Sequence, residues 1–136
     1  MPRIEAEGFE PIEVPNGTRL VRALEDNGVD ILHRCGGNAK CTTCRVEFVQ
    51  GEPVRMTVAE RNKLEEKELL GHVRLSCQIE CTHDMKLRPV NLFSQSDLSD
   101  PGPQPEAHIT PDPEWIEAPR HQPGVLLDQA QPPLVP

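Results

Sequence analysis

The residues of this chain best suited to chemistry are its cysteines. Cys35, Cys41 and Cys44 fall within ten residues in the spacing C-x5-C-x2-C, and Cys77 follows after 32 more residues. Two tetrahedral irons joined by bridging sulfides need two protein thiolates each, so one loop and one distant segment can together supply the four. Two glycines lie between the first two cysteines. Without a Cβ, they let backbone N–H groups turn inward toward a negatively charged cluster.

Other uses of these cysteines fit the sequence less well. A structural zinc site usually takes paired C-x2-4-C knuckles, and Cys77 has only Cys81 near such a spacing, which would leave five thiols in the set. A catalytic C-x-x-C needs the positive end of a following helix, whereas Cys41-Thr-Thr-Cys44 runs into the strand-like stretch Arg45–Val49. A c-type haem needs a histidine directly after the second cysteine, and a Rieske site needs two histidine ligands; neither pattern is complete.

The cysteine spacing, taken with the distant Arg74-Leu-Ser-Cys-Gln78, resembles the [2Fe–2S] ferredoxins of the β-grasp type. It is closer to the adrenodoxin-like and bacterial branch than to the plant type, whose first gap is four residues. The likeness covers roughly residues 3–93 and implies an α+β, β-grasp (ubiquitin-like) fold with a [2Fe–2S] cluster as cofactor. The ligands that it implies are Cys35, Cys41, Cys44 and Cys77. By the family's pairing, the first two would hold one iron and the last two the other.

The resemblance also implies a function. The expected protein is a soluble one-electron carrier and not an enzyme. It would take an electron from a flavoprotein reductase and pass it to an acceptor oxidoreductase. Two rival functions stay open: a redox-sensing or interaction module, in which the cluster or Cys81 reports redox state, and a detached electron-transfer subunit of a multicomponent oxygenase or reductase. Electron passage to cytochrome c through a reductase would separate a carrier from a sensor.

Length and composition agree with a small protein. The 136 residues suggest one domain of about 90 residues with an appendage. The net charge of −8 argues against nucleic acid, which favours a basic face. No apolar run approaches the roughly 20 residues of a membrane span. Five cysteines without an apolar signal region at the N-terminus favour the cytoplasm and a metal site over disulfides. With few aromatic residues, the core must rest on Leu, Ile and Val.

Hydrophobic periodicity and capping signals predict the elements that position the cysteines. In order, these are a hairpin over residues 2–15, a helix from Thr18 through about Asn27, a strand at Arg45–Val49, a helix from Thr57 to Leu70, and strands at Val73–Glu80 and Met85–Val90. Thr18 is expected to cap the first helix. Thr57-Val-Ala-Glu60 has the capping-box pattern for the second, which Gly71 can end.

The composition changes near Ser94, which divides the chain into a ferredoxin domain at 1–93 and a tail at 94–136. The tail holds ten of the fifteen prolines and seven acids against one base. Such a segment forms neither long helices nor interior strands, so we expect an acidic, extended tail. Two apolar islands interrupt the tail, Trp115-Ile116 and Val125-Leu126-Leu127. One of them, with Trp115 and Ile116 as the main contact point, is expected to dock on the body or on a partner. A chain cut after Ser94 is predicted to fold and keep its cluster.

Charged residues near the predicted site have two interpretations each. Those flanking the cluster loop, which either solvate it or offset the cluster's charge, are Arg34, Lys40 and Arg45. Acids that could dock a basic partner, or form a plain solvated surface, are Glu60, Glu65, Glu66 and Glu68 on the second helix, with Glu25, Asp26 and Asp30 near the first. Cys81 is expected to be a buried structural residue. The five histidines, at 33, 72, 83, 108 and 121, are expected on the surface.

Overall fold

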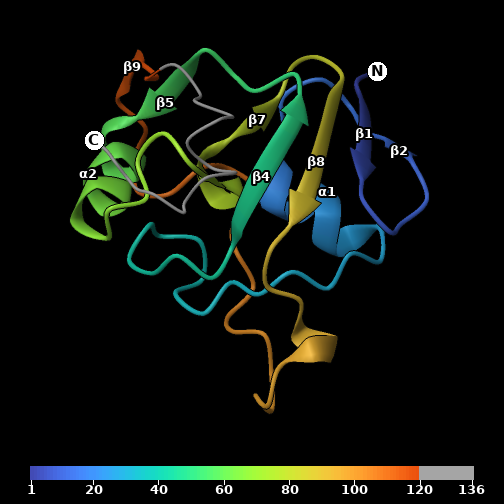
Figure 1. Ribbon diagram of the computed structural model, residues 1–136. Coiled ribbons are helices and arrows are strands. Elements are labelled where there is room, and N and C mark those ends of the chain that lie inside the picture. Colours follow the sequence, from blue (N-terminus) through green and yellow to red (C-terminus); the bar gives the residue numbers. More distant parts are fainter. Residues whose placement is uncertain (120–136) are drawn as a thin grey trace.

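The computed structural model describes residues 1–119 of the chain. Its main sheet has five strands in the order β2-β1-β8-β4-β6 (Figure 1). They are β1 Arg3–Ala6, β2 Ile12–Glu13, β4 Arg45–Gln50, β6 Arg74–Leu75 and β8 Met85–Pro89. Strands β1 and β8 run parallel, and the other neighbours run antiparallel. This order, with a helix between the first hairpin and the third strand of the sheet, is the β-grasp arrangement that the sequence predicts.

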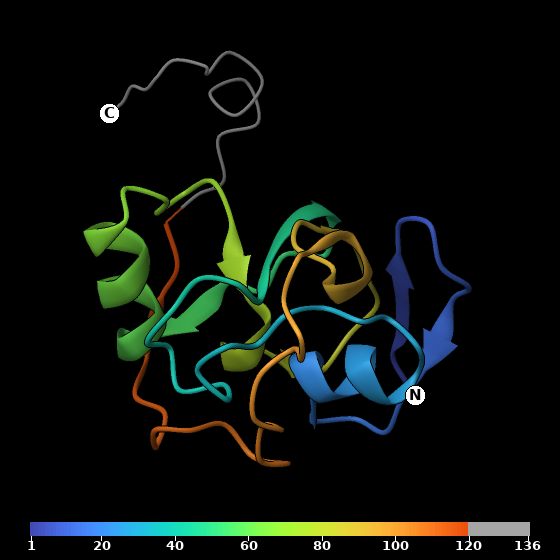
Figure 2. The same ribbon diagram turned by 90° about the horizontal axis from the view of Figure 1, so that it is seen from below.

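Short elements surround the main sheet. They are α1 Leu20–Asp26, α2 Val58–Glu66, the paired β3 Thr18–Arg19 and β7 Glu80–Cys81, the paired β5 Arg55–Thr57 and β9 Trp115–Glu117, and the 3-10 turns η1 Ser76–Gln78 and η2 Phe93–Gln95. Seen from below, α2 and the β1–β2 hairpin lie at opposite ends of the molecule (Figure 2). Within residues 1–119, no helix has both the length and the apolar character needed to cross a membrane.

The core consists mainly of Leu, Ile and Val side chains, as predicted. Helix α1 buries Leu20, Val21, Ala23 and Leu24, so its apolar face is continuous over both of its turns. Each fully buried aliphatic side chain of this kind contributes about 1.5–3 kcal/mol to folding. This packing holds α1, and the cysteine loop that follows it, against the main sheet.

The start of α1 differs from the prediction. The Thr18 hydroxyl donates to the carbonyl of Pro15 at 2.6 Å, and Thr18 pairs with Cys81 across the β3–β7 ribbon. The N-cap is Arg19, whose side chain makes no cap hydrogen bond. The predicted Thr18 cap is therefore wrong, because its hydroxyl closes the preceding turn.

Helix α2 begins as predicted and ends early. Thr57 is the N-cap and accepts from the Glu60 N–H at 3.0 Å, but the Glu60 carboxylate turns away to bind β6. The helix ends at Glu66, not Leu70. Glu68 has φ 59°, and the N–H of Leu69 reaches back to the carbonyl of Leu64, which is a Schellman ending. The chain thus reverses at a glutamate three residues before the predicted Gly71.

Cys77 lies in a turn and not within a strand. The segment predicted as one strand, Val73–Glu80, is divided into β6, η1 and β7. The 3-10 turn takes the chain from the main sheet to the small β3–β7 ribbon. Because the turn is tight, it presents Cys77 to the cysteine loop while Ser76 and Gln78 stay buried beside it.

The chain after residue 94 packs against the body as far as it is described. Strand β9 pairs antiparallel with β5, placing Trp115 opposite Thr57, and the Val58 N–H donates to the carbonyl of Glu114. Ile109 is 3% exposed and adds to the buried apolar residues. In Figure 2 this segment runs past the cysteine loop before it reaches α2 and β5. The division into 1–93 and 94–136 stays a prediction, and the second apolar island, at 125–127, lies outside the described residues.

These contacts change the result that we expect from truncation. A chain ending at residue 94 loses β9, the buried Ile109 and several hydrogen-bond acceptors of the buried Arg19. We expect it to melt about 10 °C or more below a chain ending at residue 119, because unsatisfied buried donors cost roughly 1–3 kcal/mol each. A thermal scan of both chains checks this. If the two melt alike, the extension does not stabilise the body and the sequence-based expectation stands.

Candidate metal centre

Four thiols come together at the loop between α1 and β4. The Cys41 thiol is the neighbour that most lowers the pKa of Cys35, and the Cys77 thiol is the neighbour that most lowers the pKa of Cys44. The Gln78 side-chain amide donates to the Cys77 sulfur and to the Gly37 carbonyl, so the second pair lies beside the loop that carries the first. In the described part of the chain, no three His, Cys, Asp or Glu side chains converge as around a single metal ion. The structure therefore brings the four predicted ligands together as two pairs of thiols.

Each pair holds its protons unequally. The pKa of Cys35 is lowered to about 4, chiefly because its thiolate accepts a hydrogen bond from Cys41, and the pKa of Cys41 is raised by the same contact. In the buried pair, the hydrogen bond between the two thiols lowers the pKa of Cys44 and raises that of Cys77. Two sulfurs that share one proton can exchange that proton for a metal cation. This chemistry suits a site with two thiolates for each of two irons.

The cysteine loop turns its backbone N–H groups toward sulfur. Gly36, Gly37 and Ala39 have φ of 72°, 88° and 57°, in the left-handed region. The Lys40 N–H donates to the Cys35 sulfur at 3.4 Å, and the N–H groups of Asn38 and Gly37 also lower the pKa of this thiol. A concave run of N–H groups of this kind binds anions. The loop therefore fits a negatively charged group with thiolate ligands.

The turn η1 attaches the fourth cysteine to the loop. Ser76 donates to the carbonyl of Cys44 through its hydroxyl at 2.8 Å and through its N–H at 3.2 Å. The Gln78 side-chain amide donates to the Cys77 sulfur at 3.5 Å and to the carbonyls of Gly37 and Thr110. Because these partners are buried, the position of Cys77 relative to the loop is fixed.

The site is open on one side. Cys44 and Cys77 are 2% and 0% exposed, whereas Cys35 and Cys41 are partly exposed. Thr42 and Thr43, which follow Cys41, are also partly exposed. The Thr43 hydroxyl lies 3.2 Å from the Cys41 sulfur. Solvent and partner molecules therefore reach the site at the Cys41–Thr43 edge.

The positive charges near the site differ from those that the sequence suggests. Arg34 is bound to Asp100, and Lys40 is exposed beside the loop. Arg45 is only partly exposed at the start of β4. Sequence reasoning missed Arg19, which is 1% exposed and contacts the backbone of Cys77 and of the loop. No local pattern marks it, because its acceptors lie between 18 and 91 residues away in the chain.

Cys81 and the histidines lie outside the group of four thiols. Cys81 is fully buried in β7, and burial raises its pKa to about 12, so it stays a neutral thiol as expected. His33 contradicts the expected surface position: it is 1% exposed, and its Nε2 lies 3.0 Å from a carboxylate oxygen of Glu25. His83 and His108 are exposed. The histidine at position 121 lies outside the described residues.

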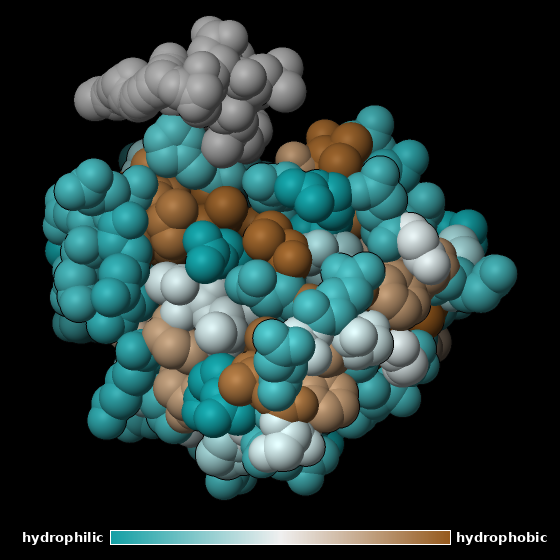
Figure 3. Space-filling view, turned by 60° about the horizontal axis from the view of Figure 1, so that its bottom comes forward, coloured by the Kyte–Doolittle hydropathy of each residue, from teal (hydrophilic) through white to brown (hydrophobic). Residues whose placement is uncertain are grey.

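The acids of α2 divide into two groups. Glu65, Glu66 and Glu68 are exposed, and Glu66 is paired with Lys63 at 2.9 Å. Glu60 is fully buried, where it binds Arg74, so its predicted role as a docking charge is wrong. In Figure 3 the surface at the end of the molecule that holds α2 is hydrophilic, and a hydrophobic area adjoins it.

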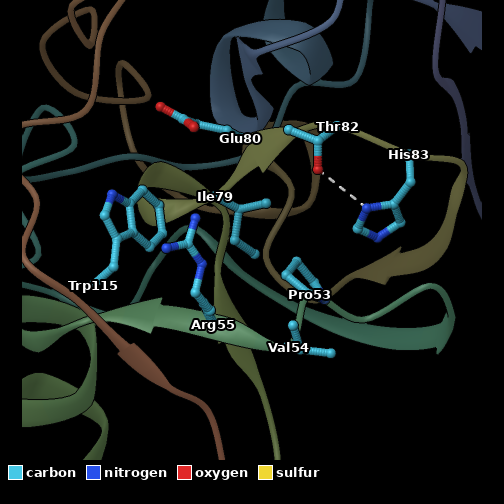
Figure 4. Close-up of a pocket in the computed structure, with 8 residues that line it drawn as sticks. All are labelled: Pro53, Val54, Arg55, Ile79, Glu80, Thr82, His83 and Trp115. Atoms are coloured by element: carbon cyan, nitrogen blue, oxygen red, sulfur yellow. Dashed lines mark hydrogen bonds between the residues drawn. The ribbon is translucent and has the colours of Figure 1, made fainter.

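A pocket of about 170 Å³ lies between β5 and the β7 segment (Figure 4). The Trp115 ring stands at one end, with the Arg55 guanidinium 5.1 Å from the ring centroid. Ile79 lies behind Arg55, and His83 at the other end is hydrogen-bonded to Thr82. None of the four paired cysteines lines the pocket. It is therefore a place where the extension meets the body, separate from the thiol site.

Comparison with protein families identifies one matching domain. The family described as "2Fe-2S iron-sulfur cluster binding domain" matches residues 5–82. Relatives include one of the subunits of the Na(+)-translocating NADH-quinone reductase in Methylococcus capsulatus, 34% identical over 80 residues, and the same subunit in Chlamydia felis, 36% identical over 74 residues. These matches cover 59% and 54% of this chain but only 19% and 17% of the relatives.

Two solved structures show the same fold. The ferredoxin from Rhodopseudomonas palustris HaA2 is 28% identical, with a TM-score of 0.51 over 67% of this chain and 97% of that chain. The ISC-like [2Fe-2S] ferredoxin from Pseudomonas putida JCM 20004 is 24% identical, with a TM-score of 0.55 over 65% of this chain and 91% of that chain. Both matches leave about a third of this chain outside the common fold.

Proposed function

Because the chain belongs to the family of 2Fe-2S iron–sulfur cluster binding domains, we propose that Cys35, Cys41, Cys44 and Cys77 hold a [2Fe–2S] cluster and that the protein is a one-electron carrier. The observation that supports this most is the meeting of four thiols in two pairs under a loop rich in inward N–H groups. When bound, such a cluster accepts and releases a single electron without a change of ligands.

The side chains of the site have separate roles in this proposal. Cys44 and Cys77, both buried, would hold one iron, and Ser76 and Gln78 keep these two ligands in place. Cys35 and Cys41, which are partly exposed, would hold the other iron. The partly exposed edge near Cys41 would be the place for electron exchange with a partner, because transfer is fastest where the protein layer is thinnest.

Partners follow from the same proposal. A flavoprotein reductase supplies the electron, an acceptor oxidoreductase takes it, and no substrate is transformed on this chain, which acts in the cytoplasm. The relatives named as part of an NADH-quinone reductase favour a second candidate, in which the domain is the electron-transfer part of a larger reductase assembly. The chain spans less than a fifth of those relatives, so this alternative concerns the common domain alone.

Electron transfer to cytochrome c tests the carrier function. Protein reduced chemically and freed of reductant should pass one electron to this basic acceptor in a stopped-flow experiment. The exposed acids of α2 should steer the encounter, so the rate should fall as salt rises. Charge reversal of both Glu65 and Glu66 to Lys should slow transfer at low salt by about tenfold.

The matched control is charge reversal of Glu10 and Glu13, which are exposed on the β1–β2 hairpin at the opposite end of the molecule. It changes the net charge equally and should slow the reaction less. Equal slowing in both variants would show that the acids of α2 do not steer the encounter with the partner. Failure of the reduced protein to pass an electron at all would exclude the carrier function.

A further inference from the structure

Arg19 is a cationic side chain enclosed by protein next to the thiol site. It is 1% exposed, and its hydrogen bonds end on oxygens of the backbone and one hydroxyl. The guanidinium donates to the carbonyls of Cys77 at 2.8 Å, Glu106 at 2.8 Å, His108 at 2.9 Å and Gly37, and to the Thr110 hydroxyl at 3.4 Å. All three of its nitrogens are thus used, and the side chain is held in one position.

The hydrogen bonds satisfy the guanidinium but do not neutralise its charge. No carboxylate among residues 1–119 forms an ion pair with Arg19, although the other buried arginine, Arg74, has Glu60 and Glu52. A buried charge without a counter-charge costs several kcal/mol. The guanidinium lies against the thiol site, because it donates to the carbonyls of Cys77 and Gly37. The negative charge available to it there is that of the cysteine ligands and of the group that they would hold.

We propose that Arg19 is the buried counter-charge of the cluster and that it binds residues 100–110 over the cysteine loop. The inference rests on the proposed cluster binding by the four cysteines. Cys77 and Gly37 belong to the cluster site, and Glu106, His108 and Thr110 belong to the extension, so one guanidinium joins the two. We call residues 100–110 the strap.

The strap lies directly on the loop. A Cβ built on Gly37 would lie 2.7 Å from Arg19 Nη2 and 3.0 Å from the Cβ of Pro105, which leaves room for glycine alone. Gly102 passes so close to the carbonyl of His33 that it too requires glycine. The His33 N–H donates to the carbonyl of Pro101 at 3.0 Å. The strap therefore covers the part of the loop at Gly36 and Gly37.

The sign of the effect on the cluster follows from charge. The reduced cluster carries one more negative charge than the oxidised cluster, so a fixed positive charge beside it stabilises the reduced form more. Arg19 therefore raises the reduction potential. Removing the charge should favour the oxidised form by roughly tenfold, which is about 59 mV for a one-electron couple.

The experiment compares three variants of the full chain, each loaded with iron and sulfide. Arg19→Gln removes the charge, and Arg19→Lys keeps it but cannot reach all the carbonyls. The control is Arg22→Gln, because Arg22 also donates to the strap, at the Pro105 carbonyl, but is partly exposed and paired with Asp26. Potentials are measured by a titration followed by visible circular dichroism. Amide hydrogen exchange of residues 100–110 reports on the strap.

The expected results distinguish charge from structure. Arg19→Gln should lower the potential by about 59 mV, whereas Arg19→Lys and Arg22→Gln should stay near wild type. Exchange in the strap should accelerate in both Arg19 variants. An unchanged potential in Arg19→Gln, or an equal fall in Arg22→Gln or Arg19→Lys, would overturn the inference.

If Arg19→Gln holds no cluster, the Arg19→Lys variant decides. A cluster at wild-type potential in that variant supports the counter-charge, and a lost cluster or a lowered potential contradicts it. A wild-type protein without a cluster would instead refute the proposed function.

Discussion

Serine in place of Cys35, Cys41, Cys44 or Cys77 is expected to lower the iron and sulfide content of the protein by about tenfold or more. A serine hydroxyl is a poorer iron ligand than a thiolate, and each cysteine in the proposed site is one of two on its iron. The loss should be most complete at Cys44 and Cys77, which are buried and cannot be replaced by water or by an added thiol. Iron and sulfide analysis of the four purified proteins measures this.

Cys81→Ser is the matched control for these variants. Cys81 is fully buried, and it lies four residues after Cys77, in β7. Its thiol is not hydrogen-bonded to the other four within the described chain, and it stays protonated because burial raises its pKa to about 12. The variant should keep the visible absorption of the parent. A colourless Cys81→Ser protein, beside a coloured variant at one of the other four, would show that the ligand set is different.

Glu60→Gln is expected to lower the stability of the fold by about 3–5 kcal/mol, which is a fall in apparent melting temperature of roughly 10 °C or more. Glu60 is fully buried and binds Arg74 through both oxygens, at 2.8 and 3.2 Å, and the Leu75 N–H at 2.9 Å. Burial raises the pKa of the Glu60 carboxyl, and the charge of Arg74 opposes this rise. Loss of the carboxylate leaves Arg74 buried with too little compensating charge.

Glu52→Gln provides the comparison at the same arginine. Glu52 lies 3.3 Å from Arg74 and its side chain is 21% exposed, so water can replace part of its interaction with the guanidinium. Its substitution should cost about 1 kcal/mol or less. Equal melting temperatures for the two variants would mean that the buried pair contributes no more than the exposed one. Arg74 begins the strand that leads to Cys77. On heating, Glu60→Gln should therefore lose its cluster at a lower temperature than Glu52→Gln, in the same order as the two variants unfold.

The proposed cysteine site is recognisable in the sequence because most of it is local. Three of its thiols lie within ten residues of one another. The glycines between the first two are typical of a loop that turns its backbone N–H groups toward a negatively charged group. Glu60 shows where local reasoning fails. Its position three residues after Thr57 is that of a capping-box partner, but Arg74 and the Leu75 N–H, about fifteen residues away, bind it instead. A buried ion pair is stronger than a cap and decides where the carboxylate points.

The strap could not be predicted because composition does not determine docking. Ten prolines exclude a helix, but a single extended chain with free carbonyls can still accept hydrogen bonds from the body. Arg19, Arg22 and Gln78 supply those donors from residues that look ordinary in sequence. Trp115, in contrast, was recognisable as an anchor, since an aromatic residue beside Ile116 stands out in a polar segment. The sequence does not show, however, that this segment pairs with strand β5.

The most direct test of the proposed cluster is a reductive titration with iron and sulfide analysis on the same sample of wild-type protein. The proposed site predicts about two irons and two sulfides per chain, a red-brown oxidised form, and reduction by one electron per chain to a paramagnetic state. One zinc per chain with no sulfide and no visible absorption, in protein made with iron available, would contradict it.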